Sequence, residues 1–337
     1  MILVTGGTGL VGSHLIYKLL TMNLKVRALK RKESDITQVK KIFNYYSDKA
    51  DELFGNIEWI EGNVADKASI FEAMENVTRV YHTAAFVSFN KRDRQNIFEF
   101  NITGTANVVD AALEMKTEKL CFVSSTAALG NPDDEFQVDE SSAWHSGKNR
   151  SAYSISKYKS EMEVWRGITE GLNAVIVNPS IIIGPGNWQR SSSKMFYEIW
   201  KGLKFYTKGI TGYVDVRDVV NIMIELMEKN IFGEKFVVSD GNYSYQEIFN
   251  MIADALGKKR PSLYATKLLT KTAFITDAIF SFISGKEPVI TGETISASGS
   301  KIFFRNNKIT EKLNYQFMPI NESIKTTAEY FLQDVSI

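Results

Sequence analysis

The sequence predicts an α/β fold: a doubly wound parallel sheet followed by a smaller, mostly helical C-terminal lobe. Two observations support this prediction. Strand-like apolar runs alternate with segments of helical periodicity through the first half of the chain, a pattern typical of βαβ units whose sheet is covered on both faces. After residue 178 the alternation fades, and glycine, proline and serine clusters indicate a chain that leaves the sheet.

The predicted strands are apolar runs bounded by turn residues or by the start of a helical pattern. They cover residues 1–5, 25–30, 57–61, 79–82, 119–124 and 174–178, with a late strand at 235–239. Between the second and third strands, Ile36, Val39, Ile42 and Phe43 follow helical spacing, which predicts an inserted amphipathic helix within residues 33–54. Residues 213–228 are expected to return to the main domain.

The bulk composition is that of an ordinary globular chain. It has 337 residues, 44% hydrophobic, and its formal charge is +1, so charge favours neither nucleic acid nor an anionic membrane as a partner. Cys121 is the single cysteine and lies in an apolar run, where we expect a packed thiol and a cytoplasmic protein. No signal peptide is expected, and residues 273–283 are too short to span a bilayer and read as a buried or partner-facing helix.

A glycine-rich turn follows the first strand directly. Residues 5–12 read TGGTGLVG, and a helical pattern begins there. A dinucleotide's pyrophosphate needs a backbone without side chains and a helix start whose amides attract negative charge, and Gly6, Gly9 and Gly12 allow both. The alternative is a glycine-rich turn without a ligand. The candidate cofactor contacts in this turn are Gly6, Thr8, Gly9, Leu10, Val11 and Gly12.

Basic residues stand where proteins specific for NAD usually carry a carboxylate. The second predicted strand ends at Lys30, and Arg31 follows. A carboxylate would repel a ribose phosphate, whereas a guanidinium can bind it with two hydrogen bonds. Lys30 and Arg31 therefore favour NADP(H) over NAD(H) as the cofactor. The alternative is a solvated basic turn.

A third motif places a phenol and an ammonium on one helical face. Tyr153 and Lys157 are four residues apart, and Ser124 and Ser125 end a predicted strand. Together with the glycine turn, these motifs resemble the extended short-chain dehydrogenase/reductase superfamily, also described as the NAD-dependent epimerase/dehydratase family. The resemblance extends over nearly the whole chain. It implies a Rossmann-type NADP-binding domain at 1–177 and 214–241 and a substrate-binding lobe at 178–213 and 242–337.

The chemistry of carbonyl reduction explains these residue types. The alkoxide that forms needs a proton, and a free phenol with a pKa of about 10 is a poor acid or base near neutrality. A nearby Lys157 cation favours the phenolate of Tyr153 and makes proton exchange workable. The resemblance implies that Lys157 also binds the nicotinamide ribose. It further implies that Ser125 polarises the substrate oxygen, with Ser124 as the second candidate.

Further cofactor contacts come from the resemblance alone. It implies that Asn63 and Val64 meet adenine, and that the small residues after the fourth strand pack on a ribose. Asn101 matches a family asparagine that either contacts the cofactor site or shapes it through a helix hydrogen bond. His82 and the run around Asp215 are read as structural. The remaining candidates are Thr83, Ala84, Ala85, Ser124, Tyr153, Asn178, Pro179, Ser180 and Ile181.

Two subclasses compete for the function. Nucleotide-sugar epimerases and dehydratases typically present an RxxNxxGP pattern, but here Asn178 and Ile181 occupy the arginine and asparagine positions. The sequence resembles instead dihydroflavonol 4-reductases and their hydroxysteroid and cinnamoyl relatives. This favours an NADP(H)-dependent oxidoreductase that reduces a small ketone or aldehyde to an alcohol. The alternatives are an epimerase/dehydratase with tightly bound NAD(P), and a non-catalytic NADP(H)-sensing protein.

The substrate contacts are less well defined by the sequence. Trp188 and Gln189 lie in a loop expected on the carboxyl side of the sheet, and Phe86 and Ser125 complete the candidates. Aromatic rings from Phe196 to Tyr206 could line a pocket, but a core position is favoured. A homodimer is a family expectation, and no metal site is expected. The sequence leaves the identity of the substrate open.

Overall fold

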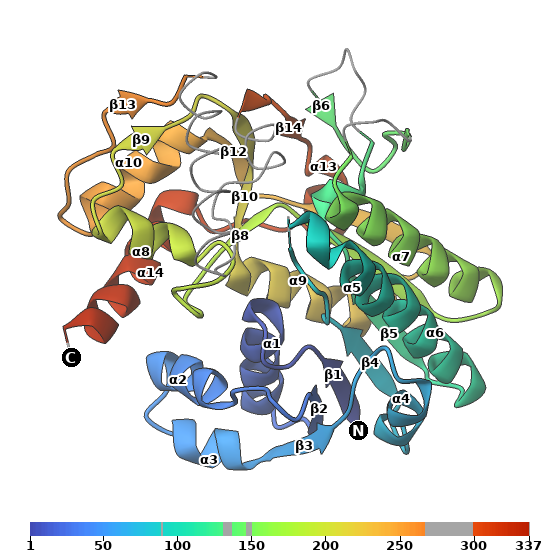
Figure 1. The fold of residues 1–337 in the computed structure, drawn as a ribbon. Helices are drawn as coiled ribbons and strands as arrows, with labels where there is room; N and C mark the ends of the chain where they lie inside the picture. The colour runs from blue at the N-terminus through green and yellow to red at the C-terminus, as the bar shows by residue number, and fades with distance from the viewer. Residues whose placement is uncertain (89, 131–136, 146–149, 267–298, 337) are drawn as a thin grey trace.

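The computed structural model describes residues 1–88, 90–130, 137–145, 150–266 and 299–336. The helix expected at 273–283 lies outside these ranges. A seven-stranded parallel sheet forms the centre, with strand order β11-β7-β5-β4-β1-β2-β3 (Figure 1). Its strands are β1 (Ile2–Thr5), β2 (Val26–Lys30), β3 (Ile57–Glu61), β4 (Arg79–His82), β5 (Lys119–Val123), β7 (Ala174–Pro179) and β11 (Glu234–Val238). The predicted doubly wound sheet is confirmed.

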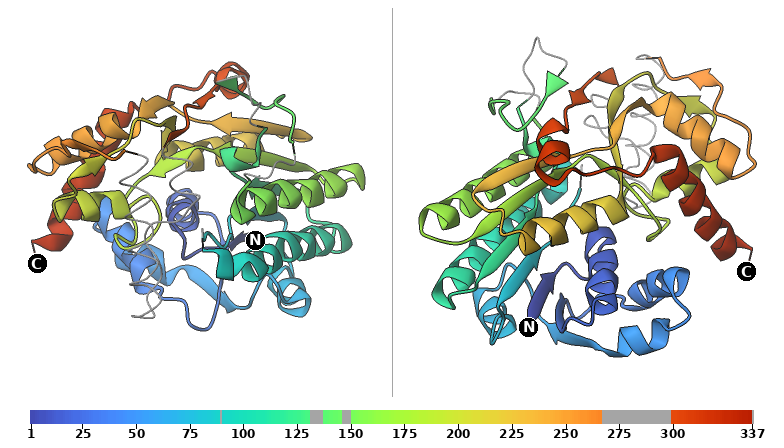
Figure 2. Two further views of the ribbon diagram at one scale, coloured as in Figure 1. Left: turned by 45° about the horizontal axis from the view of Figure 1, so that its top comes forward. Right: turned by 180° about the vertical axis from the view of Figure 1, so that it is seen from behind.

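Helices cover both faces of this sheet, as Figures 1 and 2 show. Side chains alternate along each strand: Ile2 and Val4 pack on one face and Leu3 on the other. Helices α1 (Leu10–Thr21) and α9 (Val216–Glu228) cover the first face. Helices α4 (Lys67–Ala73), α6 (Gly104–Glu114) and α7 (Ala152–Thr169) cover the second. Cys121 is fully buried in the core, as expected for a packed thiol.

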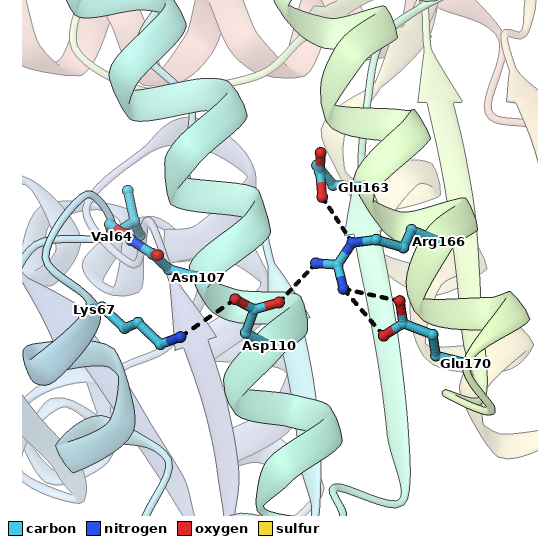
Figure 3. A network of polar contacts seen from close by, with 7 residues as sticks. All are labelled: Val64, Lys67, Asn107, Asp110, Glu163, Arg166 and Glu170. Atoms are coloured by element: carbon cyan, nitrogen blue, oxygen red, sulfur yellow. Dashed lines mark hydrogen bonds and ion pairs between the residues drawn. The ribbon is translucent and has the colours of Figure 1, made fainter.

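Polar contacts join the three helices of the second face (Figure 3). Asp110 on α6 accepts from Arg166 on α7 at 2.7 Å and lies 3.5 Å from Lys67 on α4. Arg166 also pairs with Glu163 at 3.0 Å on its own helix. The Asn107 amide donates to the Val64 carbonyl at 2.9 Å, which ties α6 to the turn after β3. These contacts link α6 to α7, to α4 and to the turn after β3.

The insertion after β2 forms two helices, where the sequence predicted one. Helix α2 (Thr37–Tyr46) buries Val39, Ile42 and Phe43, three of the residues at helical spacing. It ends at Ser47, whose extended backbone (φ −157°, ψ 137°) interrupts the helix before α3 (Ala50–Gly55). Helix α2 lies beside the C-terminal helix α14 (Ile320–Val335), with Tyr45 stacked on Tyr330 at 4.6 Å between ring centroids.

The second lobe combines helices with short strands. Strand β10 (Ile210–Asp215) pairs with β8 (Ile181–Ile183) in parallel and with β12 (Gly241–Ser244) antiparallel. Helices α8 (Lys194–Trp200), α10 (Tyr245–Ala255) and α14 pack around buried Phe196 and Phe331, so Phe196 is a core residue. In the described ranges, no helix is long and apolar enough to cross a membrane. The remaining elements are α5 (Arg94–Phe98), α13 (Asn307–Leu313), β6 (Gln137–Val138), β9 (Phe205–Tyr206), β13 (Leu263–Tyr264), β14 (Phe303–Phe304), the 3₁₀ turns Lys91–Asp93 and Thr126–Ala128, and the π-helical turn Glu99–Thr103.

Candidate active site

The glycine turn between β1 and α1 is too closely packed for side chains. Gly6 has φ +70°, and a methyl group there would lie 2.6 Å from the Ala84 nitrogen. A methyl group at Gly12 would lie 2.2 Å from the Gly6 carbonyl oxygen. Gly9 is the N-cap of α1 and has no side chain with which to cap the helix. The first-turn amides of a helix lack intrahelical acceptors, so this turn fits the pyrophosphate of a dinucleotide.

The loop after β4 lies against the same turn. The Thr83 hydroxyl donates to the Thr5 carbonyl at 2.7 Å, and Ala84 lies next to Gly6. Ala85 is exposed, and the Phe86 ring stacks on Phe100 at 5.9 Å. The structure therefore brings the candidate residues from 83 to 86 to the edge where the glycine turn lies.

The basic residues predicted to select the cofactor lie at the carboxyl end of β2. The Arg31 side chain is 46% exposed, with Nε 3.2 Å from a Glu33 carboxylate oxygen and its guanidinium 5.8 Å from the Phe100 ring centroid. Lys30 lies 3.9 Å from Glu61. Both are surface ion pairs, which are weak in water. A phosphate could therefore compete with these carboxylates for either cation.

The turn after β3 places the two candidates for adenine contact differently. The Asn63 Oδ1 atom accepts from the Ala65 amide at 3.0 Å and so shapes the turn. Val64 is 7% exposed and packs under Gly104 of α6. Contacts of Asn63 and Val64 with adenine stay predictions.

The three candidate catalytic residues meet at the carboxyl end of β5. Helix α7 begins after Ser151, whose hydroxyl accepts from the Ser154 amide at 2.9 Å, and this cap sets the direction of the helix. Ser125 lies close enough to the Tyr153 hydroxyl to lower its pKa. One turn on, the Lys157 Nζ donates to the Val123 carbonyl at 2.8 Å. Phenol, hydroxyl and ammonium thus gather at one strand end.

Burial sets the protonation of this cluster. Lys157 is 2% exposed, and loss of water lowers its pKa to about 8, while the Glu161 charge opposes the shift. Burial raises the pKa of Tyr153, and nearby Ser125 opposes that rise. Near neutral pH, Tyr153 is therefore a protonated donor beside a lysine that is still charged.

Asn101 joins the Phe86 loop to helix α7. Its side chain accepts from the Phe86 amide at 2.7 Å and donates to the Phe86 carbonyl at 3.0 Å and the Ser156 hydroxyl at 2.9 Å. Asn101 lies in the π-helical turn Glu99–Thr103, an irregularity frequent at functional sites. These contacts match the site-shaping interpretation, and a direct cofactor contact stays a prediction.

His82 is enclosed below the site. The Thr105 hydroxyl donates to the Asn101 carbonyl at 2.6 Å, so it must accept from His82 Nε2 at 3.1 Å. The other ring nitrogen, Nδ1, then accepts from the Thr5 hydroxyl at 2.7 Å. Burial lowers the pKa of His82 to about 3, so the ring is neutral. These contacts match the structural role predicted for it.

The candidates after the sixth predicted strand lie mostly inside the protein. Asn178 is 0% exposed and donates to the Ser125 carbonyl at 3.0 Å, so it holds the backbone of the candidate catalytic serine. Pro179 ends β7, and the Ser180 hydroxyl donates to Ser239 at 3.0 Å. Ile181 is half-buried at the start of β8. Cofactor contacts of these residues stay predictions.

Trp188 and Gln189 follow β8 in a loop that approaches the glycine turn. Gly186 of this loop lies beside Leu10. A methyl group added to Gly186 would be 3.1 Å from the Leu10 Cδ1 atom. Gln189 is exposed, whereas the Trp188 Nε1 donates to Asp334 at 2.5 Å and its ring meets Phe331 edge-on at 5.1 Å. The indole is thus engaged by α14, and its contact with substrate stays a prediction.

One residue of the site was missed by the sequence analysis. Glu161 is 0% exposed and accepts hydrogen bonds from Ser124 and Asn178. Its sequence signal is its spacing, four residues after Lys157 and eight after Tyr153, which places all three on one face of α7. In the part of the chain that the structure describes, no cluster of His, Cys, Asp and Glu could hold a metal ion.

The fold and this site define a class of enzymes that bind a dinucleotide at the carboxyl edge of a Rossmann-type sheet and place a Ser-Tyr-Lys cluster beside it. The sequence model of the NAD dependent epimerase/dehydratase family matches residues 2–239. The chain belongs to this family, whose members are NAD(P)-dependent oxidoreductases, epimerases and dehydratases.

Comparisons with individual proteins agree with this assignment. The chain is 30% identical over 285 residues to sterol demethylase protein B of Methylococcus capsulatus, covering 82% of this chain and 81% of that protein. It is 29% identical over 240 residues to cinnamoyl-CoA reductase 1 of Petunia hybrida, covering 68% and 69%. The crystal structure of gox2253 superposes with a TM-score of 0.81 at 29% identity, covering 99% of this chain and 98% of that chain. UDP-glucose 4-epimerase of Thermotoga maritima shares the fold, with a TM-score of 0.77 at 21% identity over 99% of both chains.

Proposed function

We propose that this protein is an NADP(H)-dependent oxidoreductase that reduces a small ketone or aldehyde to an alcohol. The observation that carries the proposal is the cluster of Ser125, Tyr153 and buried Lys157, whose Nζ donates to the Val123 carbonyl at 2.8 Å. The cluster stands at the carboxyl end of β5, the sheet edge that also carries the glycine turn. Ligands of doubly wound sheets bind along this edge.

Each residue of the cluster has a distinct task. When bound, NADP(H) supplies the hydride. Ser125 donates a hydrogen bond to the substrate carbonyl oxygen and orients it. Tyr153 gives its hydroxyl proton to that oxygen, and the charge of Lys157 stabilises the phenolate that remains. The amides of residues 9–12 would hold the pyrophosphate, because Gly6 and Gly12 let the backbone approach.

Arg31 supports NADP(H) over NAD(H). Its guanidinium stands at the end of β2, near Phe100 and paired with surface Glu33. A 2′-phosphate carries more charge than the Glu33 carboxylate and accepts the same bidentate hydrogen bonds. Exchange of Glu33 for a phosphate is therefore favourable, and Lys30 adds a second positive charge.

Buried Asn178 supports reduction over nucleotide-sugar epimerisation. This position would carry an arginine in the sugar-diphosphate pattern, but Asn178 is fully buried and bonded to the Ser125 carbonyl. Ile181 likewise brings no polar group for a diphosphate. The similarity to cinnamoyl-CoA reductase also favours a reductase.

We further propose that the protein is a homodimer and is located in the cytoplasm.

The direct test is a substrate panel. Aromatic ketones, aldehydes, flavanonols and nucleotide sugars are incubated with NADPH and with NADH, and loss of the reduced cofactor is followed by absorbance. We expect carbonyl-dependent oxidation with NADPH as the better donor. Interconversion of a nucleotide sugar without net loss of the cofactor would establish the epimerase alternative. Tight NADPH binding without any turnover would establish the sensing alternative.

A further inference from the structure

Glu161 is a buried carboxylate beside the catalytic cluster. Its Oε1 accepts from the Ser124 hydroxyl at 2.5 Å and from the Asn178 amide at 2.5 Å. Its Oε2 is buried and makes no hydrogen bond within the described part of the chain, and the Lys235 Nζ lies 3.9 Å away. The residue therefore joins the end of β5 to β7 and leaves half of its carboxylate without a hydrogen bond.

This arrangement is unfavourable for stability alone. Removing a carboxylate from water costs several kcal/mol, and replacing a buried ion pair by apolar residues is often neutral or stabilising. Joining two strands would need only a neutral acceptor, such as an amide. Burial raises the pKa of Glu161, and the hydrogen bond from Ser124, the charge of Lys235, the hydrogen bond from Asn178 and the charge of Lys157 oppose that rise. The two lysines therefore favour a charged Glu161, and Lys157 lies one helical turn away on the same helix.

Lys157 lies among groups that do little to balance its charge. Its Nζ bonds the Val123 carbonyl at 2.8 Å and stands 4.7 Å from the Phe122 ring centroid. Among titratable neighbours, His82 on β4 is neutral, and Tyr153 on the same helix stays protonated near neutral pH. Lys235 on β11 is a second cation and faces Glu161. Glu161 opposes the effect of burial on the pKa of Lys157.

We propose that Glu161 is a positioning residue of the reaction: its buried carboxylate fixes the ends of β5 and β7 and serves as the counter-ion that keeps Lys157 charged. The proposal rests on the proposed function, because a charged Lys157 is what stabilises the phenolate of Tyr153. Ser125 gains from the same arrangement, since Asn178 holds its carbonyl and is itself held by Glu161.

The test substitutes Glu161→Gln, which keeps the shape and removes the charge. NADPH affinity by fluorescence titration and kcat/KM are measured across pH. In the wild type we expect both to decline on the alkaline side near pH 8, where Lys157 loses its proton. In the variant this decline is expected about one pH unit lower, the smallest shift typical of a nearby opposite charge. Lower activity at every pH with an unmoved decline would overturn the proposal and leave a structural role only.

Two control variants assign the effect. Glu163→Gln makes the same change of charge on α7 but removes only a surface pair with Arg166, so its pH profile is expected to match the wild type. In a Lys157→Met background, Glu161→Gln is expected to leave the pH dependence of NADPH binding unaltered. A further shift in that background would contradict the counter-ion role.

Further outcomes separate this proposal from the proposed function. If no carbonyl is reduced but the alkaline decline of NADPH affinity still moves to lower pH in Glu161→Gln, the reductase assignment fails. The link between Glu161 and Lys157 then stands. If turnover is found and the decline does not move, the Glu161 proposal fails alone. If Glu161→Gln does not fold, Glu161→Asp is used, which moves the charge away from Lys157 by one methylene. This variant is expected to shift the alkaline decline of NADPH affinity and kcat/KM to lower pH by a smaller amount. An unmoved decline in that variant also overturns the proposal.

Discussion

Replacing Gly12 by alanine tests the glycine turn most sharply. The new methyl group would lie 2.2 Å from the Gly6 carbonyl oxygen, about 1.2 Å inside the ordinary contact distance of 3.4 Å. Gly6 cannot retreat, because it is packed against the backbone of Ala84. The start of α1 must therefore shift by about 1 Å, and overpacking of this kind costs roughly 1–3 kcal/mol of stability.

The same shift displaces the amides that would hold the pyrophosphate. Loss of one hydrogen bond to a charged group costs about 1.5–3 kcal/mol, so the dissociation constant for NADPH is expected to rise roughly 10- to 150-fold. Isothermal titration calorimetry measures this rise.

A second glycine supplies a matched steric control. In Gly167→Ala the added methyl group would lie 2.6 Å from the Val109 side chain, away from the glycine turn. This variant is expected to lose stability and retain NADPH affinity. A Gly12→Ala protein that binds NADPH within about threefold of the wild type would refute the reasoning.

Three further predictions concern individual side chains. Tyr153→Phe should keep NADPH affinity and lower kcat at least about 100-fold, the usual contribution of a general acid, and near-normal turnover would contradict its role. Arg31→Ala should weaken NADPH roughly 10- to 150-fold and NADH by about threefold or less, because only NADPH carries the extra phosphate; equal losses in fluorescence titrations would favour NAD. His82 stays neutral when folded but takes up a proton on unfolding below its ordinary pKa of 6.5, so it makes the protein less stable as pH falls from 7 to 5. Between pH 7 and pH 5 this proton uptake lowers the free energy of unfolding by about 2 kcal/mol. Burial raises the pKa of Asp218 to about 6, so Asp218 makes the protein more stable as pH falls. The readout is therefore the difference between wild type and His82→Asn in how the free energy of unfolding changes with pH, measured by denaturant titration. An equal pH dependence in the two proteins would exclude the effect of His82.

The sheet was predictable because its strands carry strong local signals. All seven strands of the central sheet coincide with predicted apolar runs to within about two residues. The approach of Thr83 to the glycine turn was also predictable, since carboxyl ends of neighbouring parallel strands share one edge. Helix geometry predicts that Tyr153 and Lys157 share one face of α7, and the glycine turn, the serines and the family resemblance singled this pair out.

Other features depend on contacts between distant segments. Trp188 reads as a loop aromatic facing a ligand, but its partner Asp334 lies 146 residues further along the chain. Glu161 is a charged residue in a mixed helix, and periodicity cannot show that Ser124 and Asn178 enclose it. The break at Ser47, which divides the predicted insertion helix, is a local backbone turn without glycine or proline to mark it.

Asp334 also bears on any redesign of this protein. The carboxylate of this one residue on α14 accepts the Tyr45 hydroxyl and lies 2.8 Å from the Lys41 ammonium, both from α2, in addition to the Trp188 indole. An α2–α3 segment without a lysine at position 41 would leave the mostly buried negative charge of Asp334 without its cation. Swapping the insertion therefore calls for a compensating exchange in the last turns of the chain.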